Sequence, residues 1–153
     1  MRRLALMMVA AMITSLTFAQ KLQEKDVPTP VKTTFKKQYP NTKDVKWEKE
    51  GKNFEAEFEL NKTEQSVLLN AQGNILETEV EIELNQLPSA VLDYIKANYK
   101  GQSVKEAAKI TDANGKVSFE AEVGKMDVLF DESGKFLKEK KEEVNEIDEK
   151  DED

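Results

Sequence analysis

A short alternating segment occurs twice in the chain and constrains its fold more than any other feature. Phe-Glu-Ala-Glu occupies residues 54–57 and returns at residues 119–122, an offset of 65 (119 − 54). Apolar and acidic residues that alternate with a period of two are typical of a strand with one buried face and one face in water. Each copy follows a helical pattern and precedes a hairpin signal. The chain therefore reads as two versions of one helix-plus-sheet unit.

The helical patterns repeat as well. Each consists of apolar or aromatic residues at every fourth position, which form one face of a helix: Val31, Phe35 and Tyr39, then Val91, Ile95 and Tyr99, at an offset of 60 (91 − 31, 95 − 35, 99 − 39). Thr29 is placed to cap the first helix, Pro30 suits its first position, and Pro40 ends it.

Alternation predicts four strands in each unit. They lie near residues 45–47, 54–60, 65–69 and 75–84, and near residues 104–110, 119–123, 126–130 and 136–137. The units span residues 27–86 and 87–140, and one such unit alone would bury a limited core. We therefore expect an α+β fold in which two tandem helix-plus-antiparallel-sheet repeats form one sheet of about eight strands, with the helices on one face.

The two ends of the chain differ from its centre. Residues 1–19 carry Arg2 and Arg3, then a mostly apolar run and a small-residue site ending at Ala19, which predicts a cleaved signal peptide and a periplasmic or secreted protein. A membrane anchor is the alternative, although the run is short and contains polar residues. Residues 20–26 are expected to be a flexible lead-in, and residues 141–153 an acidic disordered tail.

Charge and composition restrict the partners. The formal charge is −7, and loss of two arginines with residues 1–19 makes it −9 (−7 − 2). Such a chain is not expected to bind nucleic acid or to insert stably in a membrane after signal cleavage, whereas cationic partners remain possible. No lipid attachment or disulfide is possible without cysteine.

No residue pattern predicts catalysis, a cofactor or a metal site. The chain has neither histidine nor cysteine, which removes the commonest general base, thiol nucleophiles and zinc sites. Its serines lie in no recognisable nucleophile turn. Residues 112–115 suit a hairpin turn better than a calcium loop, because the later ligands of such a loop are missing. Trp47 alternates with Val45 and is expected in the core.

The face of the sheet opposite the helices is the candidate binding surface. If the apolar residues of the strands face the helices, strand parity turns the strand glutamates the other way: Glu55, Glu57, Glu59, Glu77, Glu79, Glu81, Glu83, Glu120 and Glu122. The simplest interpretation is a solubility face.

Four apolar residues suggest a more specific interpretation of that face. The same parity places Leu68 and Ile75 among the glutamates, and Leu129 and Phe136 equivalently at an offset of 61 (129 − 68, 136 − 75). Apolar residues ringed by charge resemble an interface core with a polar rim. A bulge at the intervening turns would instead direct them inward. The expected partner is a protein or basic peptide; the alternative function is a periplasmic structural, holding or cation-buffering protein.

The chain resembles the PepSY-like domains of secreted bacterial proteins. The resemblance covers residues 27–137 and rests on Val27-Pro28, Phe35, Tyr39-Pro40, Val45-Lys46-Trp47, Phe54-Glu55-Ala56-Glu57, Gly73, Leu87-Pro88, Tyr99 and Gly134. It implies a fold similar to the beta-lactamase-inhibitor protein and a non-enzymatic periplasmic or secreted module. Related domains in peptidase propeptides bind and restrain an enzyme. No inhibitory site can be transferred residue by residue.

Overall fold

Nine antiparallel strands form one sheet in the computed structural model, which describes residues 20–141. The strands follow one another in chain order across the sheet: β1 (Gln20–Leu22), β2 (Lys46–Glu50), β3 (Asn53–Leu60), β4 (Thr63–Leu69), β5 (Ile75–Glu81), β6 (Val104–Asp112), β7 (Val117–Val123), β8 (Met126–Asp131) and β9 (Phe136–Lys141). Helix α1 (Thr29–Gln38) joins β1 to β2, and α2 (Ser89–Asn98) joins β5 to β6. Short 3₁₀ turns, η1 (Glu24–Asp26) and η2 (Leu84–Gln86), precede the helices.

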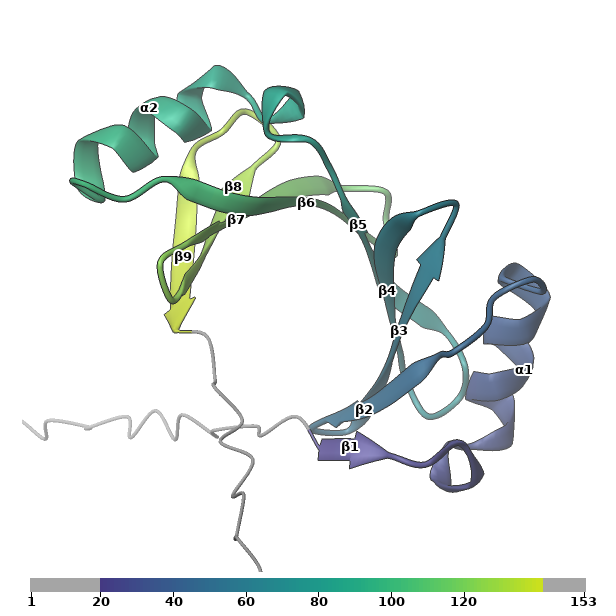
Figure 1. Cartoon of the computed structure of the whole chain (residues 1–153). Helices are drawn as coiled ribbons and strands as arrows, with labels where there is room; N and C mark the ends of the chain where they lie inside the picture. Colours follow the sequence, from purple (N-terminus) through teal and green to yellow (C-terminus); the bar gives the residue numbers. More distant parts are fainter. Residues whose placement is uncertain (1–19, 142–153) are drawn as a thin grey trace, which may run out of the picture.

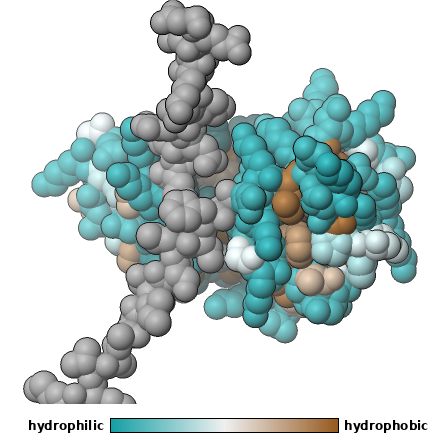
Figure 2. All heavy atoms as spheres, turned by 90° about the horizontal axis from the view of Figure 1, so that it is seen from below, coloured by the Kyte–Doolittle hydropathy of each residue, from teal (hydrophilic) through white to brown (hydrophobic). Residues whose placement is uncertain are grey.

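The sheet curves strongly, with both helices on its outer, convex side (Figure 1). Neither helix lies on its concave side. The predicted α+β class and antiparallel sheet are confirmed, and the sheet has one strand more than expected. Seen from below, the surface of the described residues is mostly hydrophilic, with a narrow apolar strip on the half that carries α1 (Figure 2).

Each helix packs on its own hydrophobic cluster. The first cluster joins α1 to β2, β3 and β4, and the second joins α2 to β6, β7 and β8. Trp47 is 6% exposed and meets Phe35 edge to face, with ring centroids 5.3 Å apart, so its predicted place in the core is confirmed. Phe130 is fully buried at the centre of the second cluster.

The prediction of a flexible lead-in at residues 20–26 was wrong. Residues 20–22 form β1, which pairs with β2 from Gln20 opposite Lys49 to Leu22 opposite Trp47. Leu22 also packs against the first cluster, so this segment gains both backbone hydrogen bonds and apolar burial. The expected signal peptide at residues 1–19 lies outside the described residues. So does the expected acidic tail, apart from Lys141 at the end of β9.

Two element ends also differ from the prediction. Thr29 is the first residue of α1, not its cap, because the first helical hydrogen bond runs from the Lys32 amide to the Pro28 carbonyl at 3.1 Å. Strand β5 ends at Glu81 and does not continue to residue 84. There the Glu83 amide donates to the Gln86 side chain at 2.9 Å, which starts η2 and removes Glu83 from the sheet.

Two turn glycines share a left-handed backbone, but only one of them lies against a helix. Gly73, in the turn between β4 and β5, has a φ of +82°, and a Cβ built there would lie 2.6 Å from the Pro30 carbonyl oxygen. Gly115, in the turn between β6 and β7, has a φ of +80°, yet nothing lies within 4 Å of its built Cβ. The two glycines share a left-handed backbone but differ in their surroundings.

We expect Gly73→Ala to lower the free energy of unfolding by about 2 kcal/mol, and Gly115→Ala by about 1 kcal/mol. In both variants an alanine must adopt a strained left-handed backbone. Only at residue 73 does its Cβ also clash with the backbone of α1. Urea denaturation of both variants measures the difference. Equal losses would show that the contact with Pro30 relaxes at no cost.

Candidate functional site

The glutamates of β3, β4 and β5 lie together on the concave face because of strand register. Glu55 lies opposite Leu68, which lies opposite Glu77. Glu57 lies opposite Ser66, which in turn lies opposite Glu79. Paired residues of an antiparallel sheet project to the same side, and the intervening Phe54, Ala56 and Phe58 are buried on the helix side. This half of the face therefore has the predicted parity.

The second half of the sheet continues the same face. Glu79 lies opposite Ile110, and Glu81 lies opposite Ala108. Ala108 lies opposite Glu120, and Glu120 lies opposite Leu129. The face thus crosses from β5 to β6 without interruption, and carboxylates from both halves of the sheet point into one space.

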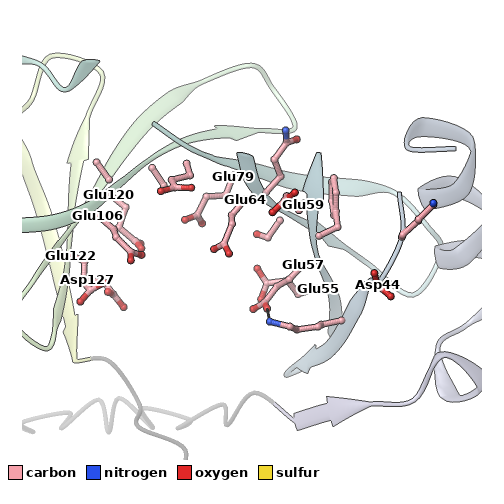
Figure 3. A pocket seen from close by; sticks show the side chains of 18 of the residues that line it. Asp44, Glu55, Glu57, Glu59, Glu64, Glu79, Glu106, Glu120, Glu122 and Asp127 are labelled. Carbon is pink, nitrogen blue, oxygen red and sulfur yellow. Dashed lines mark ion pairs between the residues drawn. The ribbon is translucent and has the colours of Figure 1, made fainter. Parts of the chain in front are cut away.

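That space is a hollow of about 760 Å³ with a strongly acidic lining. Of its nineteen lining residues, eleven are aspartate or glutamate and two are lysine. The acidic residues are Asp44, Glu55, Glu57, Glu59, Glu64, Glu79, Glu81, Glu106, Glu120, Glu122 and Asp127. In Figure 3 the labelled side chains lie around a common opening, with those of β3 to β5 facing those of β6 to β8.

The candidate residues from the sequence divide into three groups on the sheet and one residue outside it. Seven line the hollow: Glu55, Glu57, Glu59, Glu79, Glu81, Glu120 and Glu122. Three share the concave face by register but do not line the hollow: Leu68, Leu129 and Glu77. Ile75 and Phe136 lie on the opposite face, against the helices. Glu83 lies outside the sheet, before η2.

The placement of Ile75 and Phe136 on the face opposite the helices was wrong, and the cause is a pair of bulges. The register shifts between Leu68 and Leu69, which brings Ile75 opposite the fully buried Leu69. A second shift between residues 129 and 130 brings Phe136 opposite the fully buried Phe130. A bulge adds one residue to a strand and so reverses the parity beyond it.

Three glutamates of the hollow are partly removed from water. Burial raises the pKa of Glu79 to about 8, and the nearby carboxylates of Glu120 and Glu55 add to the shift. Burial likewise raises the pKa of Glu55 to about 7, although a hydrogen bond with Ser66 opposes the shift. For Glu120 burial, followed by the charge of Asp127, raises the pKa to about 7.

The neighbouring carboxyl groups shift in the same direction. Burial is the largest cause of a raised pKa at Glu57 and at Glu77. At Glu57 the charge of Glu48 adds to the shift, and Lys46 opposes it from 4.0 Å. Exposed ion pairs of this kind contribute little to stability. On this face the pKa values of five carboxyl groups are therefore raised in common.

Four acidic residues of the hollow were missed in the sequence. Glu64 lies opposite Glu59, and Asp127 lies opposite Glu122, so the strand pairing would have placed both. Glu106 falls inside the register shift between Val104 and Ala107, where parity gives no answer. Asp44 precedes β2 with a φ of +53°, a conformation that no strand pattern predicts.

Residues 112–115 form the expected hairpin turn. The Asp112 carboxylate accepts hydrogen bonds from the amides of Asn114 at 2.8 Å and Lys116 at 3.0 Å. These hydrogen bonds lower its pKa. A carboxylate that closes its own turn in this way is typical of a structural residue.

Within residues 20–141, no group of three or more acidic side chains has a geometry that could hold a metal ion. No helix in the same range is long and apolar enough to cross a membrane. The arrangement of the described residues is that of a broad, charged, concave surface.

The chain is similar to one described protein family and to several solved bacterial structures. The profile of a family described as "putative beta-lactamase-inhibitor-like, PepSY-like" matches residues 16–77 and residues 60–138. A solved BLIP-like protein from Bacteroides fragilis is 30% identical, with a TM-score of 0.57, over 74% of this chain and 86% of that one. No curated protein matches the chain.

Two further solved structures show the same fold at lower identity. A protein from Bacteroides eggerthii, described as a "putative periplasmic" protein, is 20% identical with a TM-score of 0.65, over 75% of this chain and 88% of that one. A DUF2874 family protein from Bacteroides uniformis is 21% identical with a TM-score of 0.64, over 74% of this chain and 88% of that one. With the family profile matching most of its length, the chain belongs to the PepSY-like family.

Proposed function

We propose that this protein is a non-catalytic, exported binding module whose concave sheet face binds a basic segment of another protein. The observation that carries the proposal is the charge of the hollow, where eleven acidic residues face two lysines. Complementary charge across an interface steers association and selects partners. The BLIP-like and periplasmic descriptions of similar proteins support a binding role outside the cytoplasm.

The extent of the face favours a polypeptide over a small ion. The strand carboxylates of the lining come from β3, β4, β5, β6, β7 and β8, so a bound segment would meet acidic side chains from six strands. Leu68 and Leu129 lie on the same face and provide apolar contacts beside the charges. Such a mixture suits a basic segment that also carries apolar residues.

We also infer that the chain arose as two tandem repeats. The family profile matches it twice, and each helix packs on a separate cluster. The hollow lies where the two halves meet, so neither half alone would provide the whole binding surface.

The binding proposal predicts a charge-specific loss. A fluorescent peptide of alternating lysine and leucine should bind the full-length chain, and Glu64→Lys with Glu106→Lys should weaken its binding about tenfold or more, measured by anisotropy. Both glutamates are exposed residues of the hollow, so the fold should survive. The control, Asp93→Lys with Glu132→Lys, changes the net charge equally on exposed residues of α2 and the β8–β9 turn. Equal weakening in both double variants would overturn the proposal.

Salt separates this function from the alternative of cation buffering. Raising the salt concentration from about 0.1 M to about 1 M shortens the screening length from about 10 Å to about 3 Å. Binding with an apolar component should weaken and then persist, whereas diffuse ion buffering should fade continuously. Complete loss of peptide binding at high salt would favour the buffering protein.

A further inference from the structure

We propose that the concave face exchanges protons for its cationic partner: binding releases protons from Glu55, Glu79 and Glu120, so that affinity rises with pH. This inference rests on the proposed function, since it concerns the same face. It adds a regulation, namely that acidification weakens the complex. The proposal stands first on the cross-strand neighbours of these three residues.

None of the three glutamates has a lysine or arginine opposite it in the sheet. Glu79 lies between Ser66 and Ile110. Ile110 is 5% exposed, so this neighbour is a buried hydrocarbon that cannot solvate a charge.

The other two glutamates have similar surroundings. Glu120 lies between Ala108 and Leu129. Glu55 lies between Leu68 and another acidic residue, Glu48. Apolar and acidic neighbours both disfavour the ionised carboxylate. By contrast, Glu57 has Lys46 opposite it, and Glu122 pairs with Lys105.

The wider surroundings are also mainly acidic. By register or as hollow-lining residues, the other charged groups on this face are Lys21, Lys43, Asp44, Lys46, Glu48, Glu50, Glu57, Glu59, Glu64, Glu77, Glu81, Glu106, Asp112, Glu122, Asp127, Asp131, Lys138 and Lys140. Lys105 joins them through Glu122. The lysines belong to the outer strands β1, β2 and β9 and to the segment before β2, with Lys105 at the start of β6. The centre of the face therefore has no cation of its own.

The raised pKa values of Glu55, Glu79 and Glu120 agree with this geometry. Near pH 7 these three carboxyl groups are partly protonated. An incoming ammonium or guanidinium group would displace their protons, because an adjacent positive charge favours the ionised carboxylate. Linkage makes the effect reciprocal: if binding releases protons, then protons oppose binding. Affinity should rise through the range from about pH 6 to about pH 8 and then level off.

Two measurements on the full-length chain test the proposal. The first follows the carboxyl carbon shifts of the free protein by NMR as the pH changes. We expect Glu79 to titrate well above the usual value of 4.5. The second follows binding of the lysine-leucine peptide by calorimetry in two buffers with different ionisation heats, which counts released protons. We expect net release at neutral pH and about tenfold tighter binding at about pH 8 than at about pH 6.

Matched variants locate the protons. Glu79→Gln should bind the peptide with a smaller proton release and a flatter pH profile. Glu64→Gln, which removes one carboxyl group from an exposed residue of the hollow, should keep the release.

The outcomes separate this inference from the proposed function. Peptide binding without proton release, or titration of Glu79 at its usual value, overturns the proton exchange and leaves the binding function standing. Absence of peptide binding at every pH overturns both, even if Glu79 titrates high.

Discussion

Replacing Phe136 with serine is expected to lower the free energy of unfolding by about 3 kcal/mol, the low end for loss of a core phenylalanine. The Phe136 ring stacks on Tyr94 with centroids 5.0 Å apart, and it meets the buried Phe130 edge to face at 6.3 Å. Because it is partly buried, the loss should not reach the upper end of that range. Urea denaturation monitored by circular dichroism measures the change.

Leu129 provides the matched control for this prediction. It is adjacent to the same bulge but lies on the concave face, opposite Glu120 and Lys138. Leu129→Ser should cost less than about 1 kcal/mol, as surface substitutions usually do. If the two variants lose equal stability, the bulge does not separate the faces as described.

The protein should lose several kcal/mol of stability as the pH rises from about 5 to about 9, since each unit of pKa difference between the folded and unfolded states corresponds to about 1.4 kcal/mol. In the folded chain Glu55, Glu79 and Glu120 have pKa values of about 7, 8 and 7, against 4.5 for an ordinary glutamate. The folded state therefore holds protons more tightly than the unfolded state between these values. Stability from these groups is complete below pH 4.5 and is lost as the pH rises through 7 to 8.

A pair of variants tests which residue causes this slope of stability against pH. Glu79→Gln should be more stable than the original chain at high pH and should flatten the dependence, because its amide cannot ionise. Glu64→Gln should leave the slope nearly unchanged, since Glu64 is exposed. Denaturant midpoints across the pH range provide the measurement. A slope of the opposite sign would contradict the burial of these carboxylates.

Strand alternation and helical spacing were sufficient to predict most of the sheet and both helices. They placed Glu55, Glu79 and Glu120 on one face, because parity within an uninterrupted strand is strict. They failed for Ile75 and Phe136, where a bulge follows a glycine turn and shifts the register by one residue. A period-two pattern contains no signal for such a shift.

The ends of the elements were harder to predict for a different reason. Gln20–Leu22 became a strand because β2 offered a free edge and the first cluster accepted Leu22, and both are tertiary effects. The acidity of the hollow depends likewise on curvature, which brings β3 and β7 to face one another (Figure 3). No linear pattern specifies how far a sheet bends.

The two separately packed hydrophobic clusters have a mechanical consequence. Each half has its own core, and the pairing of β5 with β6 forms the seam between them. Bending along that seam would change the aperture of the hollow without disturbing either core. Opening or closing the sheet along this seam would let the same carboxylates contact segments of different thickness, if the proposed binding function holds.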